Sequence, residues 1–123
     1  MTLKTEKHHN IDGLLSEAAG YRSRDEIKIA SGSGVVPAMR VLGKVTASGK
    51  FVPHTLAAVD GSQTAAAVNL YEIDATSADV RASAVTRDAE VRATALGLDP
   101  AADTDAEKAA IYTALAANHV IVR

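Results

Sequence analysis

The chain has 123 residues and a formal net charge of −2, which suggests one domain and excludes a polyanion binder whose affinity rests on net basicity. It has no cysteine, which excludes disulfides, thiolate metal sites and cysteine nucleophiles. It has 25 alanines against 28 residues of Ile, Leu, Val and Phe together, and because an alanine buries little surface, we expect a partner surface to supply part of the apolar burial.

Residues 1–24 are predicted to form an extended arm ahead of the domain. The segment is polar and mixed in charge, and glycines at positions 13 and 20 interrupt any long helix. Such a segment is ordered mainly by contact. We expect neither a secretory signal nor a membrane partner, because the first ten residues lack an apolar stretch and no run approaches the roughly 20 apolar residues that span a bilayer. The apolar side chains of this arm are Leu3, Ile11, Leu14, Leu15 and Tyr21.

Residues 25–92 are predicted to form strands and turns. Residues 26–29 alternate polar and apolar side chains with the period of two that is typical of a strand. Residues 40–45 and 50–52 flank a Ser-Gly sequence that suits a tight hairpin, and Pro53 should end the pairing because it has no amide hydrogen. The later elements are expected to be a turn at 60–61, one strand over 65–73, a turn at 74–77, a strand over 80–85 with Arg81 and Ser83 outward, and a short strand over 90–92.

The C-terminal part is predicted to contain a helix at about 105–117. Thr104 and Glu107 have the spacing of a capping box, in which each side chain bonds the backbone amide of the other. We expect an apolar stripe on this helix at Ala110, Ile111, Ala114 and Leu115.

After this helix, Asn118 is the expected left-handed cap residue. A terminal strand is predicted at 120–123, with Val120 and Val122 on one face. Residues 25–123 are therefore expected to form a β-rich domain that contains the helix at about 105–117.

The sequence gives no indication of a metal site. His8 and His9 are adjacent, so on an extended chain they point to opposite faces. The other two histidines, His54 and His119, have no carboxylate cluster at ligand spacing. Four acidic residues at 99–107 do not fit a calcium-binding loop and are typical of a helix N-terminus.

No catalytic or cofactor-binding residue is predicted. The chain has no Gly-x-Ser-x-Gly motif, and its Gly-x-Gly lacks the third glycine and the helix of a phosphate-binding loop. Arg81, Arg87 and Arg92 fall on neighbouring predicted strands. We interpret them as a solvated face, with a patch that pairs with an acidic partner as the alternative.

Five stretches in order carry a resemblance to a known family. They are EIKIASGSG (26–34), VLGKVTASGKFVP (41–53), DGSQTAAAV (60–68), RDAEV (87–91) and HVIVR (119–123). Together they resemble the head decoration proteins of tailed bacteriophages, the family of the phage lambda capsid-stabilising protein D. The resemblance covers about residues 25–123. Asn69 departs from it, because the pattern there favours an apolar residue.

The resemblance implies a mainly β fold with one or two short helices, a β-clip-like bent β-ribbon domain with an extended N-terminal arm. It implies a homotrimer on the outer surface of the expanded capsid, at three-fold and quasi-three-fold sites, which holds the head against the pressure of packaged DNA. The partner would be the major capsid protein, with no direct contact to nucleic acid and with no cofactor. Residues 1–24 match the family's capsid-binding arm by position. Assembly in the host bacterial cytoplasm agrees with the absence of cysteine.

Two other classes of function remain as alternatives. The first is a small β-rich adaptor module that binds a protein unrelated to capsids. The second is an enzyme, which would need converging polar residues in a pocket. A trimer that binds only expanded shells would distinguish a decoration protein from an adaptor.

Overall fold

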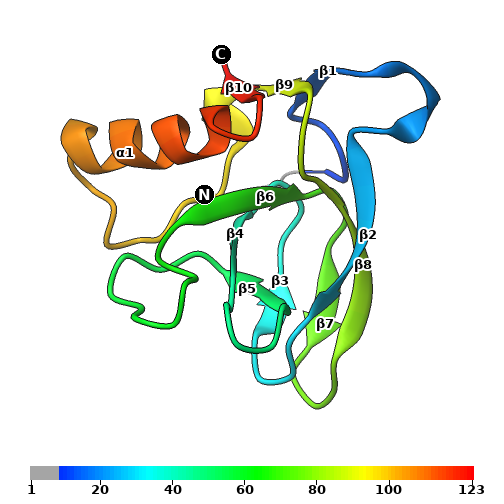
Figure 1. The fold of residues 1–123 in the computed structure, drawn as a ribbon, viewed down its shortest axis with the longest axis vertical. Coiled ribbons are helices and arrows are strands. Elements are labelled where there is room, and N and C mark those ends of the chain that lie inside the picture. The colour runs from blue at the N-terminus through cyan, green and yellow to red at the C-terminus, as the bar shows by residue number, and fades with distance from the viewer. Residues whose placement is uncertain (1–8) are drawn as a thin grey trace, which may run out of the picture.

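The computed structural model describes residues 9–123, so Leu3 and His8 lie outside the described range. Within this range the chain forms ten strands, one α-helix and two 3-10 turns, at Ala19–Tyr21 and Ala93–Ala95. The strands make a closed barrel, a three-stranded sheet and a two-stranded sheet (Figure 1). The prediction of a mainly β domain is confirmed. No helix of the described residues is long and apolar enough to cross a membrane.

Five strands close the barrel in the order β2-β5-β4-β6-β8. They are β2 (Arg24–Ile29), β4 (Val41–Lys44), β5 (Phe51–Pro53), β6 (Ala65–Asn69) and β8 (Val80–Val85). β2 and β8 are antiparallel over six residue pairs. The hairpin predicted between 40–45 and 50–52 is confirmed as the antiparallel pair β4–β5, in which Pro53 is the last residue of β5.

Small side chains fill one of the two buried clusters of the barrel region. Ala67, Ala82 and Ala84 are all buried there, together with Ile29 and Leu42. A five-stranded barrel has a narrow interior, and inward positions alternate along each strand, so alanine fits where a larger residue would not. Part of the alanine excess is therefore explained by the interior of the barrel.

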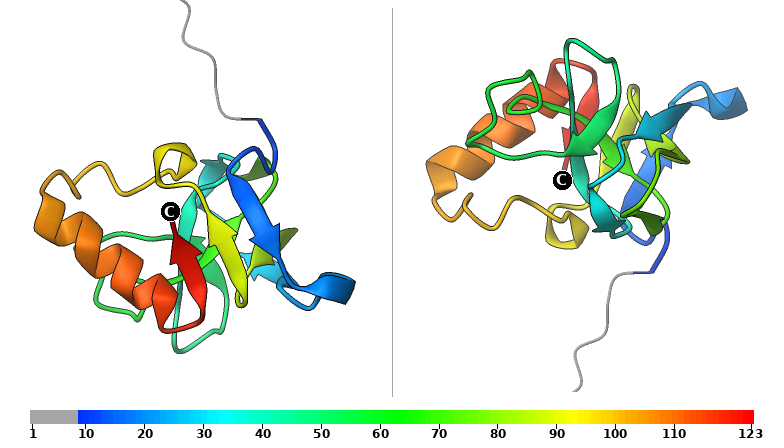
Figure 2. Two further views of the ribbon diagram at one scale, coloured as in Figure 1. Left: turned by 90° about the horizontal axis from the view of Figure 1, so that it is seen from above. Right: turned by 90° about the horizontal axis from the view of Figure 1, so that it is seen from below.

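A second core lies at one end of the barrel, beneath the helix. Its sheet has the order β1-β9-β10, formed by β1 (Leu14–Glu17), β9 (Ala89–Val91) and β10 (Val120–Val122). β10 runs parallel to β9, and β1 runs antiparallel to it. Figure 2 shows this sheet from above, with α1 (Asp105–Ala116) beside β10. As expected, Val120 is buried and Val122 packs against the same core.

The helix α1 begins at the predicted capping box. The Glu107 amide donates to Thr104 Oγ1 at 3.2 Å, and the Thr104 amide donates to Glu107 Oε1 at 3.4 Å. Ile111 and Leu115 are buried, and Ala114 packs against them. Ala110, which the sequence places on the same stripe, is exposed.

The end of α1 differs from the prediction. The residue with left-handed backbone is His119, with φ 61°, and not Asn118. The helix ends in further turns, in which the amides of Asn118 and His119 donate to the carbonyls of Leu115 and Ala116 at 3.0 and 2.9 Å. The chain therefore reverses one residue later than the sequence suggests.

The expected single strand over 65–73 is wrong, because the chain bends after Asn69. β6 ends at Asn69 in the barrel, and β7 (Ile73–Ala75) pairs instead with β3 (Gly34–Val36) in the two-stranded sheet. Asp74 consequently lies in β7 rather than in a turn, and the turn lies at 76–79. The last short strand also begins one residue earlier than expected, at Ala89.

The buried side chain of Asn69 explains this bend. Its Nδ2 donates to the carbonyls of Pro37 and Tyr71 at 2.9 and 2.7 Å. A side-chain amide that bonds the backbone two residues ahead competes with a continued strand. The departure at Asn69 therefore marks a sharp change in chain direction.

Removal of residues 120–123 should abolish cooperative unfolding, because it deletes β10 and the fully buried Val120. Circular dichroism during thermal unfolding measures this. Ile121→Ala is the matched control. This half-exposed residue should cost less than about 1 kcal/mol of unfolding free energy. A truncated chain that unfolds like the full one would contradict the placement of β10.

Candidate interaction surface

The structure separates the apolar residues that the sequence groups in the arm. Leu14, in β1 opposite Val91, packs against the core. Leu15 is 43% exposed, and Ile11 and Tyr21 are 37% and 73% exposed. Leu3 lies outside the described residues. Among the apolar arm residues that the structure describes, Ile11, Leu15 and Tyr21 are exposed to a partner. Leu14 instead packs against the core and holds β1 on the domain.

Residues 10–13 are held on the domain by hydrogen bonds to its backbone. The Ile11 amide donates to the Leu70 carbonyl at 3.0 Å, and Asn10 Oδ1 accepts from the Glu72 amide at 3.0 Å. The Gly13 carbonyl accepts from the Arg92 amide at 2.8 Å. A Cβ at Gly13 would lie 2.6 Å from that of Ala95, so the close approach requires glycine.

Arg24, the first residue of β2, organises the side chains beside this attachment. It donates two hydrogen bonds to Glu17, from Nε and from Nη2, each 2.8 Å long. The Tyr21 ring centroid lies 5.8 Å from Arg24 Cζ, within the range of a cation–π contact. The hydrogen bonds that Arg24 donates to Glu17 raise the pKa of Arg24 most, and its interaction with Tyr71 raises that pKa further. The guanidinium therefore links residues from β1, the 3-10 turn, β2 and the segment after β6.

We call Tyr21, Arg24 and Tyr71 the tyrosine face. Tyr71 is 37% exposed, and its carbonyl accepts the bond from Asn69 that bends the chain. Ile11 adjoins this face through its bond to Leu70, and Leu15 precedes Glu17 in β1. Tyrosine and arginine are the residue types most enriched at the energetic centres of protein interfaces.

Sequence reasoning missed Tyr71 as a surface residue. It placed Tyr71 inside a continuous strand, where alternation alone decides which way a side chain points. The bend at Asn69 removes that alternation. The available signal was the scarcity of aromatic residues, since Tyr71 is one of four in the chain.

Two of the three arginines in the predicted group, Arg81 and Arg87, are paired with carboxylates. Arg81 pairs with Glu26 at 3.3 Å, and its side chain is 82% exposed. Arg87 pairs with Asp25, and its guanidinium lowers the pKa of that carboxyl. These pairs support the interpretation of a solvated face, because exposed ion pairs are typical of hydrated surface.

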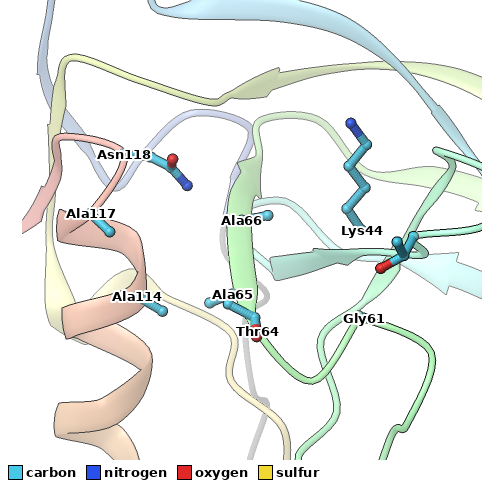
Figure 3. A pocket seen from close by; sticks show the side chains of 9 residues that line it. Lys44, Gly61, Thr64, Ala65, Ala66, Ala114, Ala117 and Asn118 are labelled. Atoms are coloured by element: carbon cyan, nitrogen blue, oxygen red, sulfur yellow. The ribbon is translucent and has the colours of Figure 1, made fainter.

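A groove between α1 and β6 has a volume of about 500 Å³. Figure 3 shows the methyl groups of Ala65, Ala114 and Ala117 on its walls, with Lys44 and Asn118 at its edges. None of its lining residues is a carboxylate or a histidine, so the groove offers no general acid–base pair. Among the described residues, no three His, Cys, Asp or Glu side chains converge as metal ligands.

One comparison with known proteins gives a match that covers almost the whole chain. The model of the bacteriophage lambda head decoration protein D family matches residues 3–120. A comparison with curated protein sequences gave no match.

Replacement by alanine should destabilise the protein at Leu14 and have little effect at Leu15. Leu14→Ala should lower the free energy of unfolding by about 1–2 kcal/mol, because it removes partly buried apolar surface from the core. Leu15→Ala should change it by less than about 0.5 kcal/mol, because the side chain is exposed. Chemical denaturation of both variants measures this, and equal effects would contradict the orientation of β1.

Proposed function

This chain belongs to the bacteriophage lambda head decoration protein D family, and we propose that it binds as a trimer at three-fold and quasi-three-fold sites of the expanded head. Membership implies a structural role in decorating and stabilising the capsid at the virion surface, without catalysis. The match over residues 3–120 carries this proposal. The β-clip-like ribbon remains part of the proposal, and the six-pair β2–β8 ladder supports it.

We propose that the capsid contact is made by the N-terminal arm together with the tyrosine face. The attachment of residues 10 and 11 at 70–72 places the start of the described chain beside Tyr71. Arg24 brings little net charge into an interface, because Glu17 already pairs with it. Tyr21 presents a large side chain whose few rotatable bonds limit the entropy lost on binding.

Trimerisation would strengthen an anchor that is weak in a single copy. Ordering a flexible segment costs about 1–2 kcal/mol per residue of backbone entropy. Once one arm of a trimer is bound, the other two are held at high effective concentration near their sites. The alanine-lined groove beside α1 is apolar surface that the described chain leaves open, which supports burial between subunits.

Tyr21→Ala should weaken binding to expanded capsids by about tenfold or more, as is typical of an interface anchor. Quantitative co-sedimentation with expanded shells measures this. Val59→Ala is the matched control, because Val59 is 94% exposed and lies outside the tyrosine face; its binding should not change.

Deletion of residues 2–8 tests the first part of the arm in the same assay and leaves every described strand in place. The truncated chain should keep its fold and lose capsid affinity. Unchanged binding by both Tyr21→Ala and the deletion variant would contradict the proposed contact.

The free protein should sediment at three times the 12.7 kDa mass of the chain. Analytical ultracentrifugation of the full chain, alone and with expanded and unexpanded shells, measures both assembly and selectivity. A monomer that binds no shell would favour the adaptor function instead.

A further inference from the structure

His54 is a titratable side chain that is almost completely enclosed. It directly follows β5 and is 1% exposed. Its Nε2 lies 2.9 Å from the carbonyl oxygen of Gln63. Because a carbonyl can only accept, Nε2 carries the hydrogen. Nδ1 is buried and has no hydrogen-bond partner among the described residues, so the imidazole is neutral with a free lone pair.

His54 lies where α1 meets the segment after β5. His54 lines a cavity of about 160 Å³ that also touches Ala110, Ile111 and Ala114 of α1. Leu56 and residues 63–65 also line this cavity. A proton added at Nδ1 would therefore place a charged donor beside a mostly apolar junction, where it costs several kcal/mol if unpaired.

Two charged groups act on this imidazole. The Arg40 guanidinium donates from Nη2 to the His54 carbonyl at 2.9 Å and opposes a second positive charge nearby. Asp99 would favour that charge, but its carboxylate already accepts from the amides of Leu56 and Ala101 at 2.8 and 3.1 Å. The cavity-lining residues of α1 and of positions 63–65 are uncharged.

Burial has the largest effect on the pKa of His54. It lowers the pKa of His54 from the ordinary value of 6.5, and Arg40 lowers it further. The bond to the Gln63 carbonyl and the charge of Asp99 raise the pKa, but by less than burial lowers it.

We propose that His54 forms an acid-sensitive contact between α1 and the segment 54–64. The neutral imidazole allows the two to pack together, and protonation of Nδ1 releases them locally while the barrel stays closed. The proposal stands on the unpartnered Nδ1, the cavity and the flanking Arg40, and it is independent of how the protein binds the capsid.

The direction of the pH dependence follows from proton linkage. The opened segment exposes His54 to water, where its pKa is near the ordinary 6.5, so the open state binds the proton more readily than the closed state. The closed state is therefore fully favoured above about pH 6.5 and loses stability as the pH falls below it. Linkage limits the loss to about tenfold in the opening equilibrium per pH unit.

Amide hydrogen exchange on the full-length protein tests this. Between pH 7 and pH 5, the protection factors of α1 should fall by about tenfold or more, whereas those of the β2–β8 ladder should fall much less. In His54→Gln the extra loss in α1 should disappear, because the amide can still donate to Gln63 without titrating. His119→Gln, at an exposed histidine, is the control and should behave like the parent.

An NMR titration of the parent protein provides a readout that needs no variant. The His54 ring should titrate below pH 6.5. Titration at or above this value would overturn the proposal, as would equal loss of protection in α1 and the barrel or the same α1 loss in a folded His54→Gln variant.

Discussion

The hydrogen bonds of Asn69 bend the chain after β6, and both the barrel and the tyrosine face depend on this bend. Its buried amide group donates to Pro37 and Tyr71, and its backbone bonds Met39 and Arg40 in both directions. A buried donor left without a partner costs about 1–3 kcal/mol, so these bonds fix the chain direction firmly. On one side of the bend, β6 closes the barrel. On the other, the chain leaves the barrel to carry Tyr71 and to receive residues 10 and 11.

The tyrosine face depends on this bend and on one ion pair. The Asn69 side chain donates to the Tyr71 carbonyl, and Glu17 orients Arg24, whose guanidinium lies over the Tyr21 ring. This pair, whose side chains are 21% and 23% exposed, joins β1 to β2 and holds Arg24 beside the Tyr21 ring. Such preorganisation lowers the entropy lost when the surface meets a partner, which suits a protein that must cover many equivalent sites on a shell.

The alanine-rich composition serves two purposes in this fold. Inside the barrel, alanines such as Ala67 and Ala84 allow the strands to enclose a narrow core. Beside α1, alanines such as Ala65 and Ala114 leave a shallow apolar groove. The apolar deficit of a monomer is therefore smaller than composition alone implies, and part of the remaining apolar surface lies in this groove.

Local patterns in the sequence determined the mainly β class, the β4–β5 hairpin and the capping box at Thr104, because each depends on neighbours only a few residues apart. The ordered stretches also determined the family, which the match over residues 3–120 confirms. Only the tertiary structure decided that Leu14 is inside while Leu15 is exposed, since their orientation depends on pairing with β9. It likewise decided that Asn69 ends a strand and that His54 is buried, because their partners are distant in the chain or face them only after folding. Contacts between distant segments produce no periodic pattern in the amino-acid sequence, so they cannot be predicted from it.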